Sequence, residues 1–181
     1  MESITNLDIF LTNAIYALPH THLLNAIFHF FSGTGSFALL WVIIIACAIA
    51  YERKRFPLLP KTLAISMFAT WFLTNFVIKN IFHRPRPLAD LLDIIQLASY
   101  PTSFSFPSGH AAFAFCAAYI LAKYDKSYAP LFYLTATLVA FSRVYLGFHY
   151  VSDVFFGAMF GIFISWLTLN YFDKMKLKQS L

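Results

Sequence analysis

The sequence is poor in charged residues. Only 12% of its 181 residues are Asp, Glu, Lys or Arg, whereas 60% are hydrophobic. Water-soluble domains average about a quarter charged residues, and a domain of this size needs such a surface to stay dissolved. The scarcity of charge therefore excludes an ordinary soluble domain and indicates a protein that is embedded in a lipid bilayer.

Cysteine and N-terminal positive charge are also scarce. The two cysteines, Cys47 and Cys116, both lie within apolar runs, which favours small core residues over a disulfide. The N-terminus carries Glu2 and Asp8 rather than a basic stretch, so we expect no cleaved signal peptide. The net charge of +5 does not indicate nucleic-acid binding, because the basic residues sit in short runs between apolar stretches.

Long apolar runs are what the sequence has instead. A helix needs about 20 mostly apolar residues to cross the hydrocarbon of a bilayer. Five segments approach this length: 37–51, 62–78, 111–124, 127–142 and 154–172. They predict an all-α, integral-membrane helical bundle with five transmembrane helices.

Two further regions carry a mixed polar and apolar pattern. Residues 6–18 and 23–31 are broadly amphipathic and are separated by Pro19, which predicts one or two helices lying in the membrane interface. A sixth crossing is the alternative, and it would move the N-terminus to the cytoplasm. Residues 83–106 are rich in proline and polar groups, and they predict an outer loop with a short interfacial helix over 88–97.

Lysine and arginine orient the bundle, because cytoplasmic loops of membrane proteins are enriched in both. With five crossings, most of the 13 basic residues fall on one side, namely Arg53, Lys54, Arg55, Lys61, Lys123, Lys126, Lys174, Lys176 and Lys178. The others are Lys79, Arg84, Arg86 and Arg143. Topology does not account for these four, so they indicate a functional site on the non-cytoplasmic face of a multi-pass cell-membrane protein.

Three polar stretches meet on that face, at residues 79–87, 106–110 and 142–153. Lys79, Arg86 and Arg143 supply three fixed positive charges, and Arg84 is a possible fourth. Guanidinium groups match phosphate oxygens in pairs, so this set favours a tetrahedral anion.

A helix is expected to start near His110, directly after Ser108 and Gly109. The free N–H groups and positive dipole end of such a helix favour an anion, and Gly109 lets the backbone approach it closely. We therefore add Ser108 and Gly109 to the predicted phosphate ligands. Ser142 is left open between a site role and simple packing.

His149 and Asp153 are four residues apart and would share one helix face. The carboxylate can then hold one ring nitrogen and leave the other nucleophilic toward phosphorus. His110 would protonate the leaving oxygen, and water would later hydrolyse the phosphohistidine.

No metal or other cofactor is expected. Carboxylates on the outer side are few, namely Asp90, Asp93 and Asp153, whereas a two-metal phosphatase needs a richer set of oxygen ligands. In this interpretation the arginines supply the positive charge that a metal would.

The pattern Lys-x6-Arg-Pro, Pro-Ser-Gly-His and Ser-Arg-x5-His-x3-Asp resembles the type 2 phosphatidic acid phosphatase superfamily, which also holds vanadium haloperoxidases, bacterial acid phosphatases and glucose-6-phosphatase. The resemblance covers roughly residues 62–172. It implies the same roles: His149 as nucleophile, Asp153 as its partner and His110 as acid. It also implies phosphate binding by Lys79, Arg86, Ser108, Gly109 and Arg143. The short chain looks most like bacterial undecaprenyl pyrophosphate phosphatases of the bacitracin-resistance type, and it is similar to phosphatidylglycerophosphate phosphatases.

The sequence therefore predicts a membrane-embedded lipid phosphatase in one domain, residues 1–181, with an interfacial segment over 1–34 and a catalytic core over 62–172. Its expected partners are the bilayer and a lipid phosphate or pyrophosphate, undecaprenyl pyrophosphate being the best match. Phosphatidylglycerophosphate, another lipid phosphate, or transfer of the phosphate to a second lipid remain alternatives. A transporter is a more distant one, because it would place charges at several depths. The oligomeric state is left open.

Overall fold

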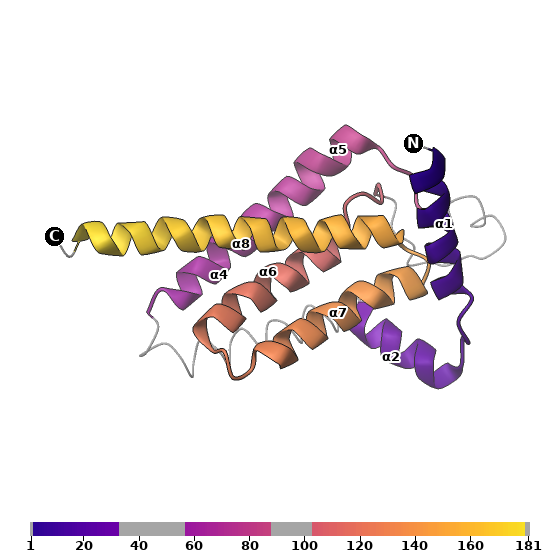
Figure 1. Ribbon diagram of the computed structural model, residues 1–181, viewed down its shortest axis with the longest axis horizontal. Helices are drawn as coiled ribbons and strands as arrows, with labels where there is room; N and C mark the ends of the chain where they lie inside the picture. The colour runs from indigo at the N-terminus through magenta and orange to yellow at the C-terminus, as the bar shows by residue number, and fades with distance from the viewer. Residues whose placement is uncertain (1, 33–56, 88–102, 180–181) are drawn as a thin grey trace.

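The structure is a computed structural model that describes residues 2–32, 57–87 and 103–179, and every regular element in these stretches is a helix (Figure 1). In chain order the helices are α1 (Glu2–Tyr16), α2 (His22–Ser32), α4 (Leu59–Phe72), the π-helix η1 (Leu73–Ile78), α5 (Lys79–Phe82), α6 (Gly109–Tyr124), α7 (Ala129–Tyr145) and α8 (Val151–Gln179). α4, η1 and α5 follow one another without a break.

The helices expected in these stretches are present, with ends that differ by a few residues. Two are long and apolar enough to cross a membrane, Leu59–Phe82 with 24 residues and Val151–Met175 with 25. α6 and α7 have 16 and 17 residues. The expected span over 37–51 and the expected interfacial helix over 88–97 lie outside the described residues, so the number of crossings stays a prediction.

α6 is the central helix, and it packs against α4, α7 and α8 (Figure 1). Most of its buried residues are small, including Ala111, Ala114 and Ala118, which lets its neighbours approach closely. On α8, a Cβ added to Gly157 would lie 2.5 Å from the carbonyl oxygen of Ser108, and one added to Gly161 would lie 2.0 Å from that of Ala112. Backbone contact of this kind is typical of small residues between membrane helices.

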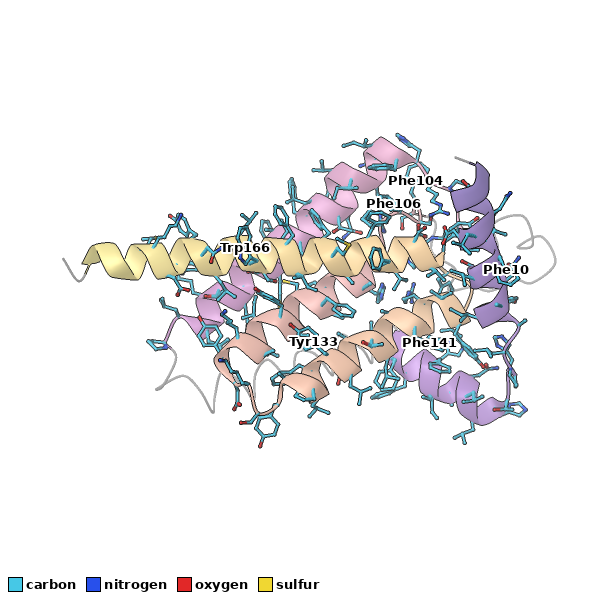
Figure 2. The ribbon with its side chains drawn as sticks, viewed as in Figure 1. Phe10, Phe104, Phe106, Tyr133, Phe141 and Trp166 are labelled. Atoms are coloured by element: carbon cyan, nitrogen blue, oxygen red, sulfur yellow. The ribbon has the colours of Figure 1, made fainter. Side chains whose placement is uncertain are left out.

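The outside of the bundle is apolar. Large side chains of α4, α7 and α8 are exposed, among them Phe68, Trp71, Leu134, Phe155 and Tyr171. Trp166 of α8, labelled in Figure 2, is another. A water-soluble protein rarely exposes so much contiguous apolar surface, whereas lipid accommodates it. The arrangement agrees with a membrane protein.

α1 lies across the end of the bundle where α7 ends and α8 begins, and α2 lies beside α7 (Figure 1). The Tyr145 hydroxyl of α7 lies within hydrogen-bond distance of two acceptors, the Pro19 carbonyl at 2.8 Å and Asn25 Oδ1 at 3.0 Å. The ring of His20 stacks on that of Tyr145, with 4.5 Å between centroids. The N-terminal helices are therefore tied to the end of the bundle that carries the predicted site.

Candidate active site

Two residues with left-handed backbone turn the chain into the site. His83 ends α5 with a φ of 47°, and Gly147 follows α7 with a φ of 71°. After Gly147 the chain folds back, so that the backbone N–H groups of Phe148 and His149 both donate to the Arg143 carbonyl, at 3.0 and 3.2 Å. Figure 2 shows Phe104 and Phe106 near the start of α8, at the same end of the bundle as Phe10 of α1.

His149 and Asp153 lie together at the start of α8. His149 Nδ1 is 3.4 Å from Asp153 Oδ2, and both side chains are almost fully buried. Asp153 Oδ2 also accepts the backbone N–H of Tyr150 at 3.0 Å. The expected pairing of ring and carboxylate is thus present in the geometry.

Arg86 fixes the tautomer of His149. Its Nη1 lies 3.2 Å from His149 Nε2 and donates to the Phe148 carbonyl at 2.7 Å. Because a guanidinium can only donate, Nε2 must be the accepting nitrogen, and the ring proton sits on Nδ1 facing Asp153. The nitrogen with the free electron pair therefore points at Arg86, one of the predicted phosphate ligands.

Lys79 and Arg86 share one acceptor. Lys79 Nζ donates to Ser103 Oγ at 3.3 Å, and Arg86 Nη2 donates to the same oxygen at 3.1 Å. Arg86 Nε also donates to the Ser103 carbonyl at 2.7 Å. Ser103 was not singled out from the sequence, since a serine in a polar loop gives no signal of its own.

The start of α6 joins the same site. The Ser108 N–H donates to the Asp153 carbonyl at 2.9 Å, while the buried Ser108 hydroxyl has no hydrogen-bond partner within the described stretches. A Cβ on Gly109 would be no closer than 3.6 Å to its neighbours, so protein packing does not require glycine there. His110 is the second residue of α6 and is partly exposed.

Arg143 is held by the N-terminal segment. Its Nη1 donates to the hydroxyl and to the carbonyl of Ser32, and its guanidinium lies over the Phe148 ring, 4.4 Å from the centroid. The Ser142 hydroxyl donates to the Val139 carbonyl of its own helix at 2.7 Å. Ser142 thus packs within α7, whereas Arg143 faces the site.

Arg84, left as a possible fourth phosphate ligand, contacts carboxylates instead. Its Nη1 donates to Asp153 Oδ1 at 2.7 Å, and its Nη2 donates to Asp8 Oδ2 at 2.6 Å. The guanidinium also lies over the Tyr150 ring, 3.9 Å from its centroid. Asp8 was not assigned a role from the sequence, although Asp8 and Thr12 are polar residues four apart, on one face of α1.

The surroundings of His149 keep its ring neutral. Burial lowers the pKa of His149 well below 6.5, and the charges of Arg143, Arg86 and Lys79 lower it further, with His110 adding to the effect. Free-base imidazole is the form that can attack phosphorus. The structure therefore brings His149, His110 and three cations within electrostatic reach of one another.

A metal site would require a cluster of side chains that can ligate the ion. Across residues 2–32, 57–87 and 103–179, no three His, Cys, Asp or Glu side chains gather as a metal site would need. Three cations, Arg143, Arg86 and Lys79, act on His149, and a cluster of positive charge suits an anion.

Comparison with known proteins assigns the chain to a family. Residues 58–176 match the PAP2 superfamily. The chain belongs to the PAP2 superfamily. It is 35% identical to phosphatidylglycerophosphatase B of Bacillus subtilis (strain 168), covering 80% of this chain and 72% of that one. It is also 32% identical to an undecaprenyl-diphosphatase of Sulfolobus acidocaldarius, covering 81% and 70%.

A solved structure agrees. The crystal structure of a transmembrane PAP2-type phosphatidylglycerolphosphate phosphatase from Bacillus subtilis superposes with a TM-score of 0.71 at 30% identity, covering 96% of this chain and 88% of that one. This PAP2 protein is therefore a membrane lipid phosphatase, a hydrolase of phosphoric esters, with an all-helical fold in the described residues.

Proposed function

We propose that this PAP2 phosphatase releases phosphate from a membrane lipid phosphate or pyrophosphate through a phosphohistidine on His149. The observation that carries the proposal is the environment of the His149 ring. Its Nδ1 faces Asp153 at 3.4 Å, and its Nε2 faces Arg86 at 3.2 Å. A nucleophile oriented by a carboxylate, beside a cation that binds the group to be transferred, is the arrangement that covalent catalysis needs.

In the first step His149 Nε2 attacks phosphorus, an N–P bond forms, and the bond from phosphorus to the leaving oxygen breaks. His110 gives that oxygen its proton. Burial and the charges of Arg143, Lys79 and Arg86 lower the pKa of His110 to about 3, so in this proposal the negative charge of the bound phosphate raises that pKa and lets His110 take up the proton first. Three cations, Lys79, Arg86 and Arg143, bind the phosphoryl oxygens as negative charge develops on them. The Ser108 hydroxyl and the N–H groups at Gly109 add hydrogen bonds from the start of α6.

In the second step water attacks the phosphohistidine. His110, now deprotonated, takes a proton from the water, the N–P bond breaks, and inorganic phosphate leaves. His149 returns to its neutral form with its proton on Nδ1. Every charge change is carried by side chains of this chain, so we propose that turnover needs no metal.

Undecaprenyl pyrophosphate is the proposed substrate, with phosphatidylglycerophosphate the nearest alternative. The relatives at 35% and 32% identity are named for these two lipids, so family membership alone does not choose between them. The test is a phosphate-release panel on purified protein that compares both lipids with phosphatidate, lipid A and a soluble ester. The highest kcat/KM on undecaprenyl pyrophosphate is expected, and a clear preference for another lipid contradicts the assignment.

We also propose the arrangement in the membrane. Five crossings would put the site at the non-cytoplasmic face, with residues 62–172 as the catalytic core and 1–34 at the interface of one membrane-embedded domain. The headgroup would then reach the site from the outer leaflet while the acyl chain stays in the bilayer, beside the exposed aromatic side chains of α4 and α8.

His149→Ala tests the chemistry. Phosphate release should fall by at least about a thousandfold, because the nucleophile is gone and only binding and charge stabilisation remain. His29→Ala is the matched control, since His29 is exposed on α2, and it should keep wild-type turnover. EDTA should leave wild-type turnover unchanged. Substantial release by His149→Ala contradicts the nucleophile, and EDTA inhibition reversed by a divalent cation contradicts metal independence.

A further inference from the structure

Asp8 is a buried acid on α1, a helix that exposes several large apolar side chains. It is 9% exposed, whereas its neighbours Leu7 and Phe10 are 57% and 68% exposed. Thr12, one turn later, is also buried. The outer face of α1 is thus suited to lipid, and its inner face presents two oxygen acceptors to the start of α8.

Those acceptors cap α8. Asp8 Oδ1 accepts the Ser152 N–H at 2.9 Å, and Thr12 Oγ1 accepts the Val151 N–H at 3.1 Å. The first N–H groups of a helix have no partner inside it, so a side-chain oxygen normally supplies one from the adjoining loop. Here another helix supplies both, and the capped helix is the one that carries Asp153.

Arg84 links Asp8 to Asp153. Asp8 Oδ2 accepts Arg84 Nη2 at 2.6 Å, and the other terminal nitrogen of Arg84 donates to Asp153 Oδ1 at 2.7 Å. Burial would raise the pKa of Asp8, but hydrogen bonds from Ser152 and Arg84 and the charge of Arg84 outweigh it and lower that pKa below 3.8. Asp8 is therefore an anion, and one guanidinium lies between two carboxylates.

We propose that Asp8 is a positioning residue for the phosphatase reaction, which acts through Arg84 to hold Asp153 in place for His149. The inference rests on the proposed roles of His149 and Asp153. Asp8 lies outside residues 58–176, which match the PAP2 superfamily, so the motifs of the family do not include it.

The physical reason is competition for Asp153. Its Oδ1 is bound by Arg84 at 2.7 Å, whereas its Oδ2 is 3.4 Å from the His149 ring. With Asp8 in place, the Arg84 charge is shared between two carboxylates, and a net negative charge remains for the ring. Without it, Arg84 pairs with Asp153 alone, neutralises it, and pulls it from His149. The phosphate ligands are untouched, so the change should affect kcat rather than KM.

Asp8→Asn is the test, because it keeps the size and an oxygen for the Ser152 N–H but removes the charge. We expect kcat for phosphate release to fall about 10–100-fold, the range for loss of a residue that orients a site ligand. KM should stay within about twofold. Asn13→Ala removes an exposed amide from the same helix and should keep wild-type kcat and KM.

A double-mutant cycle shows whether Asp8 acts through Arg84. If it does, Asp8→Asn combined with Arg84→Gln should be no slower than Arg84→Gln alone. A role only in anchoring α1 predicts instead that the two losses multiply, and that outcome overturns the proposal. Wild-type kcat in Asp8→Asn, or a raised KM at unchanged kcat, overturns it as well.

His149→Ala in the same assay separates the two claims. If it is inactive while Asp8→Asn is fully active, the positioning role is wrong and the proposed function stands. If it is active, the proposed function fails and the positioning role fails with it.

If Asp8→Asn does not purify as one species, Asp8→Glu replaces it. That variant moves the carboxylate by one methylene, so a lower kcat at unchanged KM is expected, and a wild-type kcat overturns the proposal.

Discussion

At the scale of single residues, the site is governed by where positive charge lies relative to one imidazole. Arg86 faces Nε2 of His149 and donates to four oxygens around it, namely the Ser103 carbonyl and hydroxyl, the Phe104 carbonyl and the Phe148 carbonyl. A planar fork with several fixed bonds is rigid, so a bound phosphoryl group would be held in line with the ring nitrogen. Burial keeps His149 neutral, and the cations that we propose to bind phosphate add to that effect.

The neutral state of His149 has a consequence for stability. The pKa of the buried ring lies well below 6.5 because of burial and the charges of Arg143, Arg86 and Lys79. The unfolded chain binds a proton near pH 6.5 and the folded chain does not, so the unfolded state gains protons as pH falls. The free energy of unfolding should therefore decrease as pH falls below 6.5.

We predict that His149→Gln weakens this dependence. Between about pH 7 and about pH 5, the Tm of the wild type in detergent should fall further than the Tm of His149→Gln. The acid Asp8 does not confuse the result, because its pKa is lowered below 3.8 and it stays ionised throughout. Thermal unfolding at several pH values measures both, and equal slopes for the two proteins contradict a buried neutral His149.

At the scale of elements, close packing of α6 and α8 aligns the two halves of the site. Ser108 directly precedes α6 and Asp153 lies in the first turn of α8, and the Ser108 N–H donates to the Asp153 carbonyl at 2.9 Å. Gly157 and Gly161 make this possible, since their Cα atoms lie against the backbone of α6. Side chains at these positions would move the turn at Ser108 away from His149 and Asp153.

Gly161→Ala should therefore destabilise the fold. Its Cβ would lie 2.0 Å from the Ala112 carbonyl oxygen, so the helices must move apart, at a cost of about 1–3 kcal/mol. Gly109→Ala is the control, because the nearest atom to its Cβ would be 3.6 Å away, and its Tm should match the wild type. Thermal unfolding in detergent compares the two, and an unchanged Tm for Gly161→Ala contradicts the packing.

The helices were predictable because an apolar run long enough to cross a bilayer can be recognised from its length and composition alone. That Lys79, Arg86, Ser108, His149 and Asp153 lie at one end of the bundle was predictable, because charged and polar groups are rare in such a chain. Contacts between distant segments were not. The bond from Arg84 to Asp8 joins residues 76 apart and that from Arg143 to Ser32 joins residues 111 apart, and only packing of the N-terminal helices brings them together.

Local backbone conformation also could not be predicted from the sequence. Nothing in Leu73–Ile78 distinguishes a π-helix from the α-helices on either side. Gly147 is the residue type that permits a φ of 71°, but many glycines in membrane helices serve packing instead. Its place between Arg143 and His149 becomes informative only once those two residues are assigned to one site.

At the scale of the whole molecule, orientation in the membrane is the claim to test. In a variant without Cys47 and Cys116, Asn80→Cys should react with a membrane-impermeant maleimide added to intact cells. Asn80 is exposed at the site end of the bundle. Lys126→Cys, exposed between α6 and α7 at the other end, should react only after permeabilisation. The reverse pattern would put the site at the cytoplasmic face.

The account depends most on a covalent bond between phosphorus and His149. Rapid acid-free quenching of wild-type protein during turnover with labelled lipid phosphate should trap a phosphoenzyme that is stable in alkali and labile in acid. Peptide mapping should place the label on His149, and the Asp153→Asn variant should form less of it. A label on another residue, or none under conditions where turnover is limited by hydrolysis of the intermediate, would contradict the mechanism.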